Sequence, residues 1–224
     1  MSSRDLVLGR VRDALNGIAP DATPYERAVD RGYLIEHGHR TSDQAVDLLA
    51  ENLADYRALV HRSPAHGLPE LIRRLLSARG ARRVLVPPGL PRDWTAALRE
   101  AGGPRLVEDL ATNTVDDLDR ADGVVTGCAL AIAETGTIVL DGSPDQGRRR
   151  ITLVPDHHIC VVRVPEQVVS SVPRAVARLD PVRPQTWISG PSATSDIELK
   201  RVEGVHGPRI LEVILWEQQP EGSV

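Results

Sequence analysis

Residues 69–86, PELIRRLLSARGARRVLV, carry the pattern that decides the fold. A proline stands at the start of a helical repeat and Gly80 stands just past its end, which is the preferred arrangement at the two ends of a helix. Three apolar residues, Val84–Val86, then follow as a short strand. A helix followed at once by a short apolar strand is typical of a sheet whose strands are connected by helices.

The same alternation of helix and strand continues on both sides of this stretch. Helical patterns cover residues 3–15, 42–56, 69–79, 91–101, 165–179 and 192–202, with a short helical turn after Thr114. Strand patterns cover residues 59–61, 84–86, 105–107, 123–128, 137–140, 151–154, 158–164, 186–189 and 210–216. We therefore expect an α/β fold with a mainly parallel sheet flanked by helices.

Two regions depart from this alternation. Between residues 137 and 164 strands follow one another without helices, which predicts an antiparallel excursion or a small inserted sheet. Residues 18–40 show no clear period, so we expect residues 1–40 to form an N-terminal helical arm. The α/β domain is then expected over residues 41–217, with a C-terminal tail at 218–224.

Composition restricts the class of protein. Hydrophobic residues make up 41% of the 224 positions and charged residues 26%, as is usual for a globular chain. The formal charge of −4 gives no basic footprint for nucleic acid, and no basic amphipathic helix indicates a membrane surface. The first residues lack a signal-peptide pattern and no apolar run reaches transmembrane length, so we expect a cytoplasmic protein.

Metal and cofactor motifs are missing from the sequence. The two cysteines, Cys128 and Cys160, form no C-x-x-C pair, so their thiols cannot build an iron–sulphur cluster or a structural zinc site. His157 and His158 are neighbours on a predicted strand and point to opposite faces, so we expect no metal site there. Walker, Rossmann and G-x-S-x-G motifs are also absent.

The first candidate site is the tetrapeptide Glu134–Thr137, which lies between two apolar runs. Gly136 supplies backbone freedom, and the hydroxyls of Thr135 and Thr137 can bond locally or to a ligand. Glu134 is either a solvated turn residue or a general base, a nucleophile or a hydrogen-bond acceptor in a cleft.

The second candidate site covers residues 188–208. Ser189, Gly190, Ser192, Thr194 and Asp196 lie at the predicted start of the helix 192–202, where free backbone N–H groups favour an anion. Simple capping by Ser192 explains the same residues. His206 stands between two glycines and is either an acid, a base or a donor to a ligand, or a loop histidine bonded to a carbonyl.

A third cluster is the run Arg148–Arg150. Such a run either helps to hold an anionic ligand or an acidic partner, or is simply solvated.

The four segments AETGTIVL, LVPDHHICVV, SGPSATSDIEL and GVHGPRILEVIL, in this order and spacing, resemble the LUD domain, and within it the LutC/YkgG (lactate utilisation) family. The resemblance covers residues 41–217 and is sharpest over 123–215. Ser195 departs from the pattern, which has a small apolar residue such as Ala at that place.

The resemblance implies a fold similar to the NagB/RpiA/CoA-transferase-like group. It also implies a role in the oxidation of L-lactate to pyruvate, as a non-redox subunit that works with separate iron–sulphur subunits. This chain itself is then expected to bind no cofactor, and iron–sulphur clusters are expected on the partner subunits.

By analogy with that fold group, Glu134, Thr135 and Thr137 are expected to face Ser189, Gly190, Ser192 and Thr194 across one crevice that holds a small anionic metabolite, with His206 as a wall. Asp196 is expected to orient the ligand or to fix the start of the helix. Two alternatives stay open. One is a stand-alone enzyme of the sugar-phosphate isomerase or CoA-transferase type that uses Glu134. The other is a metabolite-sensing module.

Overall fold

The structure, a computed structural model, describes residues 2–18, 29, 32–195, 201–203 and 206–217. Contacts divide the chain into two units, Met1–Leu34 and Ile35–Val224. The first unit contains α1 (Ser3–Ala14), whose N-cap Ser2 forms a capping box with Asp5. This confirms the helix expected in the N-terminal arm.

The second unit is built on a six-stranded sheet in which every strand pairs in parallel, with the order β1-β12-β7-β4-β2-β3. β12, the last strand of this sheet in chain order, therefore lies between β1 and β7. The sheet consists of β1 (Leu59–Ser63), β2 (Arg83–Val86), β3 (Arg105–Glu108), β4 (Gly123–Thr126), β7 (His157–Val164) and β12 (Ile210–Glu217). The α/β class and the mainly parallel sheet are confirmed.

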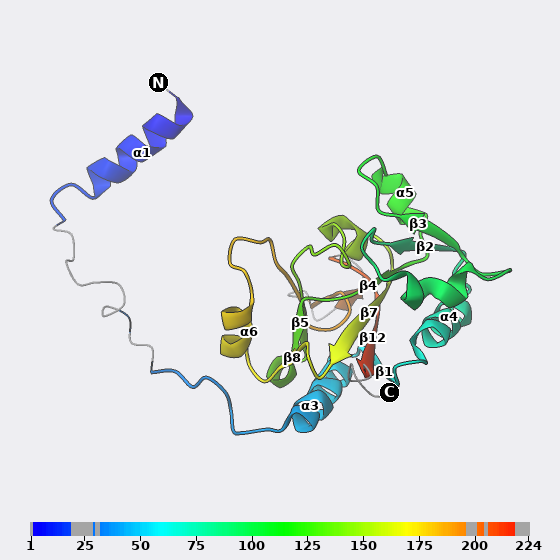
Figure 1. Cartoon of the computed structure of the whole chain (residues 1–224). Helices are drawn as coiled ribbons and strands as arrows, with labels where there is room; N and C mark the ends of the chain where they lie inside the picture. The colour runs from blue at the N-terminus through cyan, green and yellow to red at the C-terminus, as the bar shows by residue number, and fades with distance from the viewer. Residues whose placement is uncertain (1, 19–28, 30–31, 196–200, 204–205, 218–224) are drawn as a thin grey trace. The chain divides into compact units, whose positions relative to one another are not determined.

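Helices cover this sheet on both faces (Figure 1). On one face α4 (Leu68–Ala78) and the 3-10 helix η1 (Arg92–Arg99) bury apolar side chains against Val84 and Val86. On the opposite face the short α5 (Val115–Asp119) buries Leu118 against Leu85. The helices that connect the strands next to β2 therefore lie on opposite faces of the sheet.

A smaller four-stranded sheet forms a second layer, as the consecutive strand patterns predict. Its order is β8-β5-β6-β9, with β6 antiparallel to both of its neighbours. Its inner face and α3 (Ser42–Asp55) share one core with the large sheet, and α6 (Val172–Arg178) packs on its outer face. Its strands are β5 (Leu130–Ile132), β6 (Thr137–Leu140), β8 (Val168–Val169) and β9 (Thr186–Ile188).

Three sequence-based assignments are wrong. Residues 151–154 form no strand; the 3-10 helix η3 (Arg149–Thr152) instead places Ile151 in the core beside Leu118. The apolar run was too short to distinguish a strand from another buried segment.

The helix expected over 165–179 begins only at Val172. Ser171 is its N-cap, and residues 168–169 pair as β8 with β5. The sequence pattern places Pro165 at the start of the helix, whereas in the structure it is Pro173, the second residue of α6, that lies in the first turn.

The helix expected over 192–202 is replaced by an antiparallel pair, β10 (Ala193–Ser195) and β11 (Arg201–Glu203). Ser and Thr side chains compete with helical hydrogen bonds, and here strand pairing takes the place of the helix.

A buried ionic cluster is centred on Glu212 of β12. The Glu212 side chain, 3% exposed on β12, has His61 Nε2 at 2.6 Å, Arg79 Nε at 2.8 Å and His157 Nε2 at 3.2 Å. Burial opposes ionisation, but these three contacts lower the pKa of Glu212 well below its usual range. This carboxylate therefore stays charged inside the fold.

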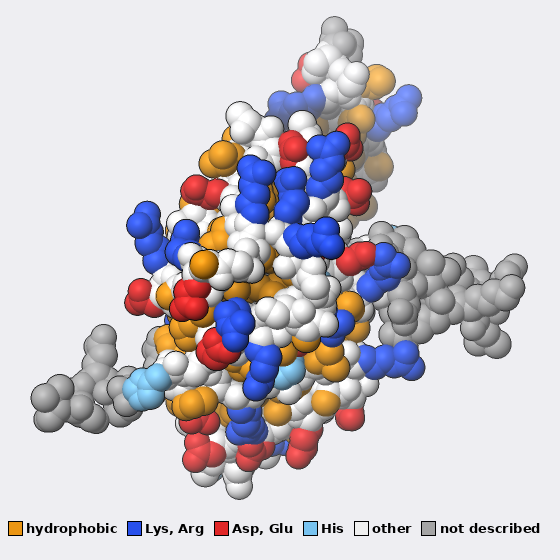
Figure 2. Space-filling view, turned by 90° about the vertical axis from the view of Figure 1, so that its right-hand side faces the viewer, with side chains coloured by type: hydrophobic (Ala, Val, Ile, Leu, Met, Phe, Trp, Pro, Cys, Tyr) orange, Lys and Arg blue, Asp and Glu red, His pale blue; other side chains and the backbone are white. Residues whose placement is uncertain are grey.

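Surface charge is mixed on the face drawn in Figure 2, where basic, acidic and hydrophobic side chains all appear among other groups. Among the described residues, no helix is long and apolar enough to cross a membrane.

Candidate functional site

The residues expected to meet in one crevice separate into two groups. Ser189, Gly190, Ser192 and His206 line a cavity of about 290 Å³ beside β9. Glu134 does not line it; its carboxylate is held on the turn η2 (Ala133–Thr135) between β5 and β6. The four residues that line the cavity therefore form a candidate binding site, whereas Glu134 makes its contacts elsewhere.

Thr137 connects the two groups. Its hydroxyl lies 2.8 Å from the Ser189 hydroxyl and 2.8 Å from the Thr135 hydroxyl. Because Thr137 is buried at the start of β6 and Ser189 follows β9, the pairing of these strands brings them together. The expected meeting of Thr135 and Thr137 with Ser189 is thus present in the structure.

Residues 206–208, which precede β12, form one wall of the cavity. The Ser192 Oγ accepts the backbone N–H of His206 at 3.0 Å, and the Ser192 N–H donates to the Pro208 carbonyl at 2.8 Å. His206 is exposed and its backbone is fixed by Ser192. Thr194 lies opposite Val202 in the β10–β11 pair, and Asp196 lies outside the described residues.

Two further residues line this cavity that the sequence indicated only weakly. His158, at the start of β7, is 1% exposed and its Nε2 lies 2.8 Å from the Thr126 hydroxyl. Burial, with a smaller contribution from His157, lowers the pKa of His158 to about 3, so the ring is neutral at physiological pH. It offers the cavity a hydrogen-bonding group without charge.

The second is Arg149, from the run of three arginines. Arg148 pairs with the buried Asp109, and its Nε lies 3.0 Å from both Asp109 oxygens. Arg150 donates to the Leu110 carbonyl at 3.1 Å. The Arg149 side chain is exposed, lines the cavity and has no counter-ion among the described residues. One arginine of the three is therefore available to an anion.

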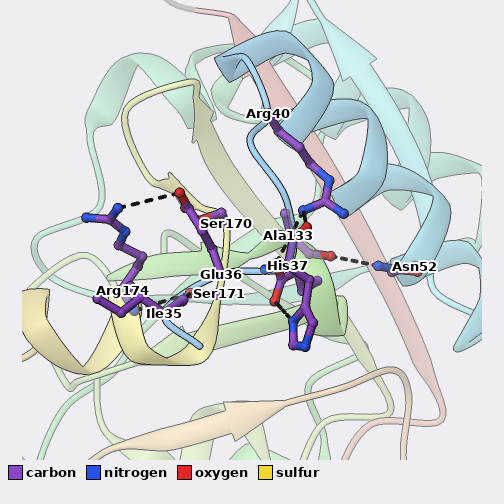
Figure 3. Close-up of polar contacts among 10 residues, drawn as sticks. Ile35, Glu36, His37, Arg40, Asn52, Ala133, Ser170, Ser171 and Arg174 are labelled. Carbon is purple, nitrogen blue, oxygen red and sulfur yellow. Dashed lines mark hydrogen bonds and ion pairs between the residues drawn. The ribbon is translucent and has the colours of Figure 1, made fainter. Parts of the chain in front are cut away.

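Glu134 accepts hydrogen bonds from the segment that precedes α3, in which Figure 3 labels His37 and Arg40. The His37 N–H donates to its Oε1 at 2.7 Å, His37 Nδ1 lies 3.1 Å from its Oε2, and Arg40 Nη1 donates to Oε1 at 3.2 Å. Although burial opposes it, these contacts lower the pKa of Glu134. In the structure the carboxylate acts as an ionised acceptor.

The same segment, Ile35–Arg40, is held at a second place (Figure 3). Ser170 donates to Glu36 Oε2 at 2.7 Å, the Ser171 hydroxyl donates to the Ile35 carbonyl, and Arg174 lies 3.6 Å from Glu36. We name residues Ile35–Arg40 the strap. It joins the β5–β6 turn to the start of α6.

The two glycines of the predicted site have packing roles. Gly136 has φ +56°, and a Cβ there would lie 2.7 Å from the backbone carbon of Asn52 on α3. Gly190 has φ +85°, and a Cβ there would lie 2.4 Å from the Tyr56 carbonyl oxygen. Both glycines let the small sheet approach the C-terminal end of α3 closely.

Comparison with known proteins agrees with this architecture. The sequence profile of the LUD domain matches residues 33–216. The chain belongs to the LUD domain family.

Within the LUD family, the chain is similar to relatives with a name and to a protein of solved structure. It is 49% identical over 169 residues to a Deinococcus radiodurans protein named Lactate utilization protein C, covering 74% of this chain and 76% of that one. A Bacillus subtilis protein of the same name is 27% identical over 192 residues, which cover 75% and 76% of the two chains. The crystal structure of a DUF162 family protein from Deinococcus radiodurans superimposes with a TM-score of 0.66 at 39% identity, covering 80% of this chain and 99% of the other.

Proposed function

We propose that this LUD-family protein takes part in L-lactate utilisation as a non-redox subunit, acting with separate iron–sulphur subunits that oxidise L-lactate to pyruvate in the cytoplasm. Support comes from the relatives named Lactate utilization protein C, one of them at 49% identity. The two cysteines are buried in the core that the large and small sheets share. Too few thiols are present to hold a cluster.

The ligand that we propose for the 290 Å³ cavity is a small hydroxy- or keto-acid. The observation that carries this proposal is the position of Arg149, a cation without a counter-ion among the described residues, on the wall of a small cavity. Arg149 would pair with the carboxylate. The hydroxyls of Ser189 and Ser192 and the neutral ring of His158 are the groups available to the hydroxyl or carbonyl oxygen.

Genetic complementation tests the lactate role. The gene is deleted in its own host, and growth on L-lactate as sole carbon source is compared with growth on glucose. We expect growth on L-lactate to be lost and restored by the wild-type gene. Unimpaired growth of the deletion strain, in a host with no other lactate oxidase, would contradict the proposal.

Purification from the same host tests the partnership. The tagged chain is isolated from cells grown on L-lactate, and the co-purifying proteins and iron are measured. Iron–sulphur proteins in fixed ratio to the chain are the expected result. A chain that elutes alone and iron-free after mild crosslinking would overturn the assembly.

Calorimetric titration with L-lactate and pyruvate tests the small cavity. Replacement Arg149→Gln removes the cation, and Ser192→Ala removes a hydroxyl of the wall. Arg105→Gln, at an exposed position on β3, is the matched control. Binding that is weakened by both cavity variants and unchanged in the control supports the site. Equal affinity in all three would refute it.

The stand-alone enzyme alternative relies on Glu134 as base or nucleophile. A general base works best with a pKa near the operating pH, and the contacts with His37 and Arg40 lower the pKa of Glu134 instead. Its environment gives this alternative no support. A metabolite-sensing role would use the same small cavity, and stabilisation by L-lactate without any requirement for the gene in growth would favour it.

A further inference from the structure

A second, larger cavity of about 660 Å³ adjoins the small one and is not needed for lactate. Arg149, Thr152 and Thr186 line both cavities. Cavities of this size hold ligands of drug or cofactor dimensions, and an acid as small as lactate would leave most of the space empty. The cavity therefore suits a different and larger molecule.

The large cavity lies at the carboxyl ends of β2 and β3, beside the point between β2 and β4 where ligands bind in open parallel sheets. From β2 the chain moves to β3 on one side, and β4 then pairs on the other side of β2. The winding changes direction between β2 and β4, and a crevice opens beyond the carboxyl ends of strands at such a point. Pro88 follows β2, Asp109 follows β3, and both line the cavity.

The loop 141–149 builds the roof over this point and is fixed in place. The Gly89 N–H donates to the Pro144 carbonyl and the Gly127 N–H donates to the Asp145 carbonyl, each at 3.0 Å. The backbone N–H of Arg148 also donates to buried Asp109, at 3.1 Å. Because these contacts tie the loop to the ends of β2, β3 and β4, the cavity is preformed.

The lining indicates the chemistry of the ligand. Pro88, Pro144 and Pro184 contribute rigid, apolar rings to the lining, and a planar ring would pack against these. Asp109 forms an ion pair with Arg148, so the charge of Arg148 is not available to a ligand. Arg149 is the cation left for an anionic group.

From this arrangement we propose that the large cavity binds a nucleotide, that is, a heteroaromatic ring with a phosphate group, and that Arg149 pairs with the phosphate. The ring would lie among the three prolines, and Ser143 and Thr186 would meet its polar edge or its sugar. This site adjoins the proposed lactate site in the small cavity and shares Arg149 with it.

The test is calorimetric titration of the full chain with ATP, NADH and FMN, with inorganic phosphate and L-lactate as comparison ligands. We expect one of the nucleotides to bind saturably at one site, and inorganic phosphate to bind at least about tenfold more weakly because it lacks the ring. If none of the three nucleotides binds at millimolar concentration, the proposal is overturned.

Three variants locate the binding. Ala111→Trp places a large ring at the exposed edge of the large cavity, and Arg149→Gln removes the cation; we expect each to weaken nucleotide binding about tenfold or more. Ser192→Ala changes only the small cavity and should leave nucleotide binding unchanged. Circular dichroism checks that each variant is folded.

The variants also separate this inference from the lactate proposal. If Ala111→Trp abolishes nucleotide binding and leaves lactate binding intact, the two sites are distinct as proposed. If Ser192→Ala abolishes nucleotide binding while Ala111→Trp does not, the large cavity is not the site and the inference fails, whatever the outcome for lactate.

Discussion

Glu134 accepts the backbone N–H of His37 at 2.7 Å, although 97 positions separate the two residues in the chain. This bond explains why a carboxylate stands between two buried apolar runs. It fastens the strap to the turn between β5 and β6, and Arg40 adds a charged contact to the same oxygen at 3.2 Å.

Replacement of Glu134 by Ala should release the strap. The variant loses the bonds to the His37 N–H and to Arg40, and we expect the free energy of unfolding to fall by about 1 kcal/mol. Amide exchange at His37 should become markedly faster. The matched control is Glu51→Ala, at an exposed position on α3. Unchanged exchange at His37 in the Glu134 variant would refute the anchoring role.

Gly136→Ala should destabilise the fold through contact as well as conformation. A Cβ at this position lies 2.7 Å from the α3 backbone, and we expect a loss of about 3 kcal/mol in urea unfolding. Gly80→Ala isolates the conformational part, because Gly80 has φ +65° and open space around its Cβ position; we expect about 1 kcal/mol there. Equal losses would show that the approach of α3 is not limiting.

Two neighbouring arginines should differ in their effect on stability. Arg148→Gln leaves the buried Asp109 carboxylate without its counter-ion. We expect the free energy of unfolding to fall by about 2 kcal/mol, which is less than for a fully buried pair because the Arg148 side chain is 41% exposed. Arg149→Gln should change stability by less than about 0.5 kcal/mol. Adding Asp109→Asn to Arg148→Gln should restore part of the loss, and an additive double variant would argue against the pair.

Stability should fall in mild acid because of His158. Its pKa is about 3 in the folded chain and near 6.5 in the unfolded chain, so the unfolded state binds more protons between these values. The free energy of unfolding should therefore decrease as pH falls below about 6.5, by up to about 1.4 kcal/mol per pH unit.

The His158→Gln variant should flatten this slope between pH 6 and pH 5, whereas the exposed His39→Gln should not. Glu212 acts at lower pH, because its lowered pKa contributes stability that is lost only as pH falls below about 4.5. An identical slope in wild type and His158→Gln over the upper range would contradict the assignment.

Most helices and strands could be predicted because the residues that begin, end and pattern them are neighbours in the sequence. Proline and glycine at the ends of α4, and the short run before Pro87, agree with the observed helix and with β2. Patterns failed where partners distant in the chain decide. Residues 193–195 pair with 201–203, and 168–169 pair with β5, and no local signal indicates either pairing.

The candidate site was predictable in its residue types more than in its contacts. Ser189, Ser192 and His206 line one cavity, as the sequence predicts, because the segment after β9 and the segment before β12 meet there. The strap on Glu134 was not foreseen, because it depends on a segment without any period. Arg149 could not be distinguished from Arg148 by sequence, since only the buried Asp109 separates their roles.

The position of β12 bears on how the protein is made. Residues 210–217 are made after the other five strands of the large sheet, yet they fill the place between β1 and β7. Until they emerge, β1 lacks its sheet partner and β7 exposes one row of unpaired backbone groups. The sheet therefore cannot close until β12 has been made, and the unpaired edges of β1 and β7 are where a nascent chain would need protection from pairing with its neighbours.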